Sequence, residues 1–399
     1  MKRRTIILLL LILVAGTALR IAVNDVDDYS PDDEAVYVRT TAFLWHNGWT
    51  SYPTLVRNYL ADRGAWLYPD PMRWGHFALT TLACTVSGKC DARTLADLST
   101  AAGILSILLI FLLGRELLGD EVALIASALS ITSPLQLAMG RRALQDEVLC
   151  ASVLLTLWLG AKAIRAARTS PRQRLLLTAA AIAATTLTLG IKESSLLLYP
   201  ALFLFVTALA PSPRGRAWPR IAALFVLPLL LHAAVTLVLC GGVEPYLRLL
   251  HVVGTAASSV NSDFALQYSS GPFHRPLFDL VILSPLVVVL AIVGAARSHR
   301  DRALDALALF AVATLIVFGL LTLKNVRYVI AIDPVARLLA ASALASLPRR
   351  PWLLLGALGV IATTELRLFF DLFEMANIYD PVTEWMLRAL GSISTPPQD

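Results

Sequence analysis

Apolar segments long enough to cross a lipid bilayer recur along the whole chain, and they limit the possible folds more than any motif does. A membrane-spanning helix needs about 20 mostly apolar residues. We expect such helices at about 5–23, 95–118, 121–139, 147–164, 175–191, 195–210, 221–240, 278–296, 303–323, 329–347 and 352–370. The sequence therefore predicts an all-α, polytopic membrane protein with about 11 transmembrane helices.

The composition agrees with a protein that is surrounded mostly by lipid. Of its residues, 57% are hydrophobic and 16% are charged, whereas a soluble domain carries roughly 25% charged residues. The net charge of +6 would suggest nucleic acid binding in a soluble protein, but here no basic run is interleaved with aromatic residues. We expect membrane lipids, and no nucleic acid, as partners. The four cysteines lack CxxC spacing, and isolated thiols are favoured over a disulfide between Cys84 and Cys90.

The distribution of arginine predicts the orientation in the membrane. Four predicted loops are basic and nearly free of acidic residues, which is typical of cytoplasmic loops. They are 165–174, 211–220, 297–302 and 348–351. All four lie inside only if the short apolar stretch 76–86 does not span the bilayer. We then expect a multi-pass protein of the plasma (inner) membrane, with a cytoplasmic N-terminus and an uncleaved first helix.

The same orientation places most acidic residues on the opposite side. Residues 1–370 form the predicted transmembrane domain. Within it, the first loop, 24–94, is the largest extracytoplasmic segment, and we expect it to carry interfacial helices. A second large extracytoplasmic loop is expected at 241–277, and an extracytoplasmic tail at 371–399.

An acidic segment in the first loop is the leading candidate for catalysis. Pro31-Asp32-Asp33-Glu34 follows the first helix, and both proline and acidic residues favour the N-terminus of a helix. The same pattern is typical of an ordinary acidic helix start. A carboxylate held at the membrane surface also suits a general base, and we expect this base to be Asp33 or its neighbour Asp32.

Basic residues at predicted extracytoplasmic helix ends form a second set of candidates. They are Arg142, Lys192, Lys324 and Arg327. Cations in such places bind phosphate, and arginine does so through two parallel hydrogen bonds. Each has a structural alternative. Arg142 could instead pair with an acid of its own loop, and Lys192 with Glu193. Lys324 and Arg327 could instead extend to lipid headgroups.

An aromatic and basic stretch, 66–76, leads into the short apolar segment. Its Tyr68, Arg73 and Trp74 fit a platform for a sugar, although an aromatic belt at the membrane surface explains part of the pattern. No Walker loop, HExxH motif, nucleophile elbow or dinucleotide fingerprint is present.

The order of these segments resembles the GT-C superfamily of polytopic glycosyltransferases. Within it, the sequence is most similar to family 39, which includes protein O-mannosyltransferases and the aminoarabinose transferases that modify lipid A. The matching positions are Asp33-Glu34, Tyr37, Tyr68-Pro69-Asp70-Pro71, Arg142, Asp146, Lys192, Arg327-Tyr328 and Pro334. The match departs from the family at Pro69-Asp70-Pro71, where a Pro-Pro pair is common.

The resemblance implies a sugar donor linked to polyprenyl or dolichyl phosphate, and a glycan, lipid or protein acceptor. A lipid phosphate is a competent leaving group, so inverting transfer needs one carboxylate base and no second acid, unlike most glycoside hydrolases. The implied catalytic residues are Asp33, Glu34 and Asp146. The implied phosphate contacts are Lys192, Lys324, Arg327 and Arg142. The implied substrate contacts are Tyr37, Tyr68, Arg73, Trp74, Glu193 and Tyr328. A divalent metal ion is possible, with Glu147, His76 and His274 as candidate ligands.

Three other functions fit parts of the pattern. A transporter or lipid flippase predicts charges near the bilayer midplane and paired broken helices, and Asp333 and His232 are the residues to watch. A lipid-linked oligosaccharide ligase shares the fold and the side of the membrane. A non-catalytic scaffold predicts that Asp33, Asp146 and Arg327 lie far apart.

Overall fold

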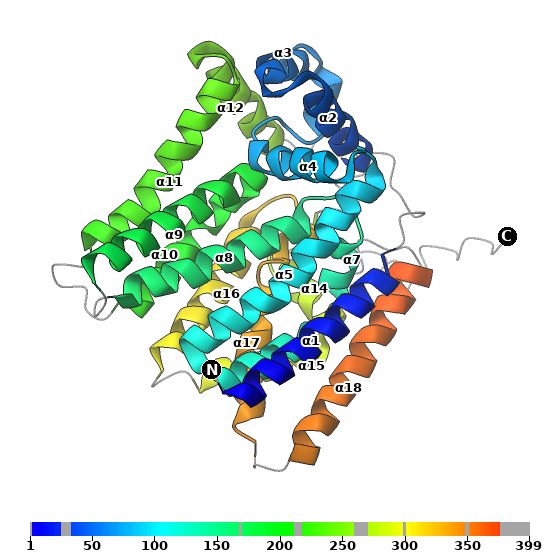
Figure 1. Cartoon of the computed structure of the whole chain (residues 1–399), viewed down its shortest axis with the longest axis vertical. Helices are drawn as coiled ribbons and strands as arrows, with labels where there is room; N and C mark the ends of the chain where they lie inside the picture. The colour runs from blue at the N-terminus through cyan, green and yellow to red at the C-terminus, as the bar shows by residue number, and fades with distance from the viewer. Residues whose placement is uncertain are drawn as a thin grey trace.

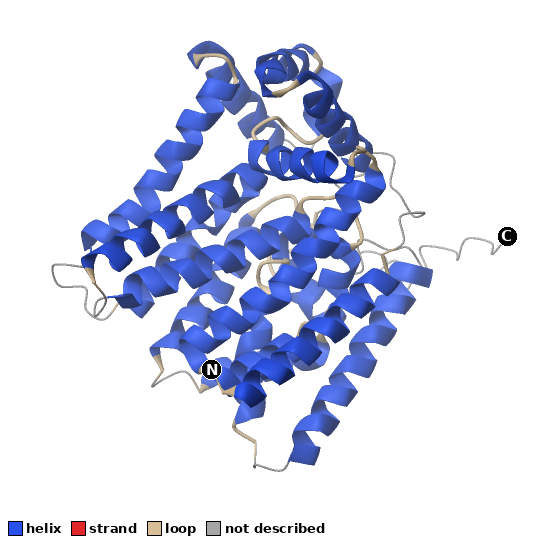
Figure 2. Cartoon of the chain, viewed as in Figure 1, coloured by secondary structure: helices blue, strands red, loops and turns tan. Residues whose placement is uncertain are grey.

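The described part of the chain is helical throughout. The structure, a computed structural model, describes residues 2–24, 33–166, 170–210, 218–258, 270–297, 301–347 and 351–375. Within these ranges there is no β-strand (Figure 2). The all-α prediction is therefore confirmed.

Seven helices are long and apolar enough to cross a membrane. They are α1 (Arg3–Ala22), α5 (Ala92–Leu118), α8 (Asp146–Arg165), α9 (Pro171–Ile191), α11 (Trp218–Leu239), α16 (Arg302–Leu320) and α18 (Pro351–Phe369). Two bent pairs bring the number to at most nine in the described ranges. They are α6 (Asp120–Leu129) with α7 (Pro134–Gly140), bent by 63°, and α14 (Arg275–Leu283) with α15 (Pro285–Ala296), bent by 116°.

The predicted count of eleven helices is not confirmed, because two predicted spans are short. The segment predicted at 195–210 consists of a 3₁₀ turn, η4 (Glu193–Leu198), and α10 (Tyr199–Leu209). The segment predicted at 329–347 contains only α17 (Asp333–Ala345), which is buried over nearly its whole length. Apolar composition alone does not separate a helix that faces lipid from one that other helices enclose.

Both predicted large loops fold into helices that pack together. The first contributes α2 (Asp33–Asn47), α3 (Tyr52–Ala61) and α4 (Trp74–Ser87), and the second contributes α12 (Val243–Ser258). These four helices gather at one end of the molecule, at the top of Figure 1. We call them the helical cap. They share a hydrophobic core of their own, which includes Tyr37, Tyr52, Phe77 and Leu249.

A disulfide closes the turn between α4 and α5. The Cα atoms of Cys84 and Cys90 lie 4.8 Å apart and their sulfur atoms are bonded. The prediction of isolated thiols is therefore wrong. The helix ends at Gly88, whose φ of 73° is a left-handed conformation that glycine adopts without strain. The chain reverses there and brings Cys90 back beside the last turn of α4.

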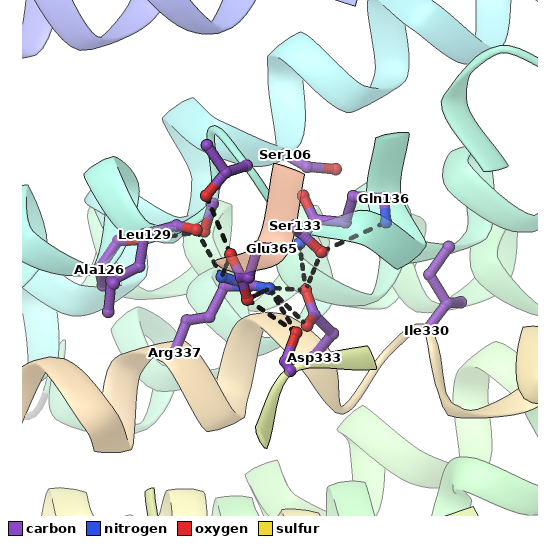
Figure 3. A network of polar contacts seen from close by, with 12 residues as sticks. Ser106, Ala126, Leu129, Ser133, Gln136, Ile330, Asp333, Arg337 and Glu365 are labelled. Atoms are coloured by element: carbon purple, nitrogen blue, oxygen red, sulfur yellow. Dashed lines mark hydrogen bonds and ion pairs between the residues drawn. The ribbon is translucent and has the colours of Figure 1, made fainter. Parts of the chain in front are cut away.

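Charged side chains fill the space where the two bent helix pairs break (Figure 3). The Arg337 guanidinium donates to Glu365 at 2.8 Å, to Asp333 at 2.9 Å and to Ser284 Oγ, between α14 and α15, at 3.2 Å. It also donates to the carbonyl of Leu129, the last residue of α6. A helix break frees backbone groups that lipid cannot satisfy, so polar side chains must do so.

A second buried arginine stabilises the break between α6 and α7. Arg20 of α1 donates to the carbonyl of Ser130 at 3.1 Å and to that of Ile131 at 3.4 Å. Its guanidinium also reaches the side chain of Gln136 in α7. The sequence singled out Asp333 among buried charges but missed Arg20 and its neighbours in the network. The signal that could have identified Arg20 is its position inside an apolar segment.

Candidate active site

The first five residues of α2 bring three side chains to three arginines from other segments. Asp33 Oδ2 lies 3.3 Å and 3.5 Å from the two terminal nitrogens of Arg327. Glu34 accepts two hydrogen bonds from Arg142, at 2.7 and 2.8 Å, and a third from a backbone N–H at 2.9 Å. Acidic residues suit this position because the helix N-terminus carries partial positive charge.

The third side chain, Tyr37, accepts a hydrogen bond from Arg73 through its hydroxyl oxygen. Burial raises the pKa of Tyr37, so the hydroxyl keeps its proton. The same guanidinium forms two hydrogen bonds to Glu193, at 2.6 and 2.7 Å. Arg73 therefore links the cap to the junction between α9 and α10.

Asp146 lies at the centre of the arrangement. It begins α8, its side chain is fully buried, and it accepts a hydrogen bond from Lys192 Nζ at 2.7 Å. Arg327 approaches its other oxygen at 3.9 Å. The Lys192 ammonium also lies 5.0 Å from the centre of the Tyr328 ring, over its face. The structural alternative of a Lys192–Glu193 pair is not realised, because each residue has a different partner.

Close packing of two glycines sets the distance between α4 and α9. A Cβ on Gly75 would lie 2.9 Å from the backbone of Gly190. A Cβ on Gly190 would lie 2.7 Å from the Trp74 ring. Larger residues at either position therefore separate the two helices. This close approach brings Arg73, at the start of α4, against Glu193, just past the end of α9.

Two ionisable groups near Arg73 are shifted by burial. Burial and the nearby Glu193 carboxylate raise the pKa of Asp70 to about 7, although Arg73 lies 3.7 Å away. Burial lowers the pKa of His76 to about 3, so its ring is neutral. The His76 ring packs edge-on against Tyr37 at 4.9 Å, and neither ring nitrogen has a hydrogen-bond partner among the described residues.

Several predicted site residues lie outside this group. Tyr68 is exposed at the edge of a groove in the cap, and Trp74 donates to His232 at 3.3 Å. Lys324 donates to the carbonyl of Leu321. His274 packs against the ring of Phe278. Glu147 accepts from Ser106 at 3.0 Å. Asp32 lies outside the described residues.

The candidate metal ligands do not come together. Among the described residues, no three His, Cys, Asp or Glu side chains are placed to hold a metal ion. The carboxylates of the site are instead each held by a cation: Asp33 by Arg327, Glu34 by Arg142, Asp146 by Lys192. This donor set does not fit a divalent ion, and we derive no step through one.

The four cations differ in how firmly they are held. The exposed fraction of the side chain is 5% for Lys192, 7% for Arg142, 12% for Arg73 and 23% for Arg327. Arg327 also has the longest ion-pair distances. Its partner Asp33 is 38% exposed, and Asp33 Oδ1 has no partner among the described residues. Asp33 and Arg327 are therefore the members of the group most open to a ligand.

The sequence missed one ion pair at the edge of the site. Arg141, next to Arg142, is buried and pairs with Glu374. Glu374 belongs to the π-helical turn that follows α18, at the start of the segment predicted to be a tail. The signal was present, since an arginine in a loop expected outside breaks the orientation rule and calls for an anionic partner.

Comparisons with known proteins give one family match and a set of related folds. The family model described as dolichyl-phosphate-mannose-protein mannosyltransferase matches residues 74–238. The matched stretch includes Trp74, Arg142, Asp146 and Lys192. It does not include Asp33 or Arg327. No curated protein sequence matches the chain significantly.

Solved structures of two membrane enzymes have the same fold. ArnT from Cupriavidus metallidurans, bound to undecaprenyl phosphate, is 18% identical with a TM-score of 0.53, over 83% of this chain and 63% of its own. The oligosaccharyltransferase of Archaeoglobus fulgidus, in its apo form, is 14% identical with a TM-score of 0.63, over 100% of this chain and 57% of its own. A complex of the A. fulgidus enzyme AglB with an inhibitory peptide and a dolichol-phosphate has a TM-score of 0.59 at 15% identity, over 93% of this chain and 55% of its own.

The chain is similar to this mannosyltransferase family over residues 74–238, and it has the fold of these solved GT-C enzymes. It spans less than two thirds of the length of each of these solved structures. At this level of identity the comparison establishes the fold, and the activity of this protein has to be argued from its own site.

Proposed function

We propose that this protein transfers a sugar from a polyprenyl or dolichyl phosphate to an acceptor hydroxyl, with inversion at the anomeric carbon. The ArnT structure holds undecaprenyl phosphate and an AglB structure holds a dolichol-phosphate, which supports a lipid phosphate as the donor's carrier. The observation that carries the proposal is the 3.3 Å contact between Asp33 and Arg327, which lie 294 residues apart in the sequence. Unlike the buried ion pairs of the protein, this pair is partly exposed, and Asp33 Oδ1 has no partner among the described residues.

In the proposed reaction, Asp33 Oδ1 accepts the proton of the acceptor hydroxyl. The hydroxyl oxygen forms a bond to the anomeric carbon as the bond between that carbon and the phosphate oxygen breaks. The lipid phosphate leaves with the electron pair. Arg327, the most exposed cation of the site, stabilises the negative charge that develops on the phosphate.

The other predicted site residues have positioning roles in this proposal. Glu34 and Arg142 hold each other by two short hydrogen bonds and fix α2 on the turn before α8. Lys192 holds Asp146, which in turn lies beside Arg327. Arg73 joins Tyr37 to Glu193. Lys324 lies outside this group and donates to the carbonyl of Leu321, so we assign it no role in the proposed reaction.

We place the protein in the plasma (inner) membrane, and two independent features support an extracytoplasmic position of its site. The basic loops predicted in the cytoplasm follow α8, α10, α15 and α17, and the C-terminal ends of α8 and α17 lie away from the cap (Figure 1). The Cys84–Cys90 disulfide lies in the cap end of the molecule. Disulfides persist in oxidising compartments and are rare in the cytosol.

The transporter alternative finds some support in the two broken helix pairs and the buried charges. Those charges are, however, paired with one another and with backbone groups at the breaks, which explains them as structural. Likeness to the oligosaccharyltransferase keeps a second transferase open, in which a lipid-linked oligosaccharide is moved instead of a single sugar.

The test is transfer by the purified protein. Radiolabelled polyprenyl-phosphate sugars are incubated with it and with extracted membrane lipids or glycans, and the mass of the product is measured. We expect a labelled product whose mass rises by one sugar. No transfer from any of these donors would refute the proposed activity, and a product larger by several sugars would indicate the ligase.

The base assignment is tested with Asp33→Asn. We expect it to lower turnover by about 10²- to 10⁴-fold, the usual contribution of a general base, without changing the thermal unfolding temperature much. The matched control is Asp371→Asn, which removes a surface ion pair with Arg367 and should leave turnover unchanged. Near-normal turnover by Asp33→Asn would refute the assignment.

A further inference from the structure

The cap contains a groove beside the candidate active site. It lies between α2, α3 and residues 62–71 and has a volume of about 280 Å³. We call it the α2–α3 groove. Small-molecule sites in proteins usually start at about 300 Å³, so this groove suits one or two sugar rings better than a lipid tail or a folded peptide.

The groove begins one helical turn from Asp33. Val36 and Thr40 line it and follow Asp33 by three and seven residues, so all three share one face of α2. At 1.5 Å per residue, Thr40 lies about 10 Å along the helix from Asp33. A molecule whose reacting hydroxyl is at Asp33 therefore extends along α2 into the groove.

The lining of the groove combines an apolar floor with a polar rim. Tyr59 and Phe77 contribute buried aromatic surface to the floor, and Tyr68, which is 39% exposed, presents a ring at the edge. The rim carries Arg39 and Asn58. Few polar groups above an apolar, aromatic surface are typical of a site that orients a small ligand.

The rim side chains are available for binding. Within the described residues, neither Arg39 nor Asn58 forms a hydrogen bond or an ion pair with another side chain. Asp62, also on the rim, uses one oxygen to accept from the N–H of Gly64 at 2.9 Å and leaves the other open. A guanidinium, an amide and a carboxylate oxygen together supply the donors and acceptors that neighbouring sugar hydroxyls require.

We propose that the α2–α3 groove binds a neutral sugar residue of a glycan acceptor, next to the sugar whose hydroxyl meets Asp33. This inference rests on the proposed function and specifies its acceptor class. One cation and one carboxylate on the rim balance in charge, which suits a neutral ring better than a phosphate. The site cations Arg327 and Lys192 lie in other segments, the 3₁₀ turn η6 (Val326–Val329) and the α9–α10 junction.

The test measures binding without any donor. The full-length protein in detergent is mixed with methyl glycosides of glucose, galactose, mannose and N-acetylglucosamine, and saturation-transfer NMR detects the bound ones. We expect a signal from at least one glycoside. In Asn58→Trp, whose indole fills the groove, we expect that signal to fall at least tenfold. Tyr68→Ala should weaken the signal in the same direction.

The matched control is Arg57→Trp. Arg57 adjoins Asn58 on α3, is exposed and contacts Thr54 outside the groove; this variant should keep the signal. Thermal unfolding checks that all three variants are folded. A wild-type protein that binds none of the glycosides, or equal binding by Asn58→Trp, would overturn the groove assignment. Transfer activity with no groove binding leaves the enzyme intact and refutes only the groove, whereas groove binding without transfer refutes only the activity.

Discussion

At the residue scale, Asp33 and Glu34 are neighbours with different environments. Glu34 is 2% exposed and accepts three hydrogen bonds from described residues, two of them from Arg142. Asp33 is 38% exposed and contacts Arg327 at longer distances through one oxygen. A carboxylate whose two oxygens are both hydrogen-bonded stabilises the fold, whereas one with an unbonded oxygen can accept a proton. The structure therefore supports Asp33 as the reactive member of the pair.

Asp70 gives a prediction about pH and stability. Its folded pKa of about 7 lies above the ordinary value of 3.8, so between these values the folded protein holds a proton that the unfolded chain releases. The protonated carboxyl therefore contributes a few kcal/mol to the free energy of unfolding below about pH 4. This contribution is lost as the pH rises to 7. We expect Asp70→Asn to remove this loss, as measured by unfolding temperature across pH 4 to 7. Parallel curves for variant and wild type would contradict the shift.

The sequence identified most of the charged residues of the site but not their pairing. Asp33, Asp146, Lys192 and Arg327 were singled out because charges are costly and rare beside apolar segments. Their partners depend on how helices from distant parts of the chain pack. Adjacency therefore suggested Lys192–Glu193, whereas packing pairs these residues with Asp146 and Arg73.

At the scale of elements, α4 and α9 position the Arg73–Glu193 contact through Gly75 and Gly190. We expect Gly190→Ala to push α4 away from α9, because its Cβ would lie 2.7 Å from the Trp74 ring. Misplacement of site groups by about 1 Å can cost on the order of 100-fold in rate. Turnover and unfolding temperature of the purified variant should both fall.

Gly356→Ala in α18 is the matched control, since no atom lies within 4 Å of a Cβ placed there. Alanine favours a helix over glycine by about 1 kcal/mol, so this variant should be as stable as the wild type or more so. Equal behaviour of the two variants would show that the close approach at Gly190 is not required.

Element boundaries were predictable where apolar runs are long and flanked by polar residues, as for α5, α8 and α16. They were not predictable where a helix is interrupted. The breaks between α6 and α7 and between α14 and α15 occur inside apolar stretches, and the arginine side chains that stabilise them come from α1 and α17. The residues around a break therefore do not reveal which distant side chain will stabilise it.

At the scale of the whole molecule, the C-terminal ends of α8 and α17 lie away from the cap (Figure 1), and the proposed orientation predicts labelling from opposite sides of the membrane. Asn58→Cys in α3 should react with a membrane-impermeant maleimide on intact cells. Arg172→Cys at the start of α9 should react only after permeabilisation. The native cysteines do not interfere, because Cys150 and Cys240 are buried and the other two are bonded. The reverse labelling pattern would place the candidate site in the cytoplasm.

The buried Arg337 has a consequence for how the nascent chain enters the membrane. It lies on α17 with Asp333, and its other carboxylate partner, Glu365, is on α18. Each charge at the centre of a lone helix costs about 2.5 to 3.5 kcal/mol on insertion. We therefore expect α17 to leave the translocon only with α18. Ribosome-bound chains truncated before Glu365 should keep α17 accessible to alkali extraction or proteases, and stable insertion of α17 from such chains would contradict this order of assembly.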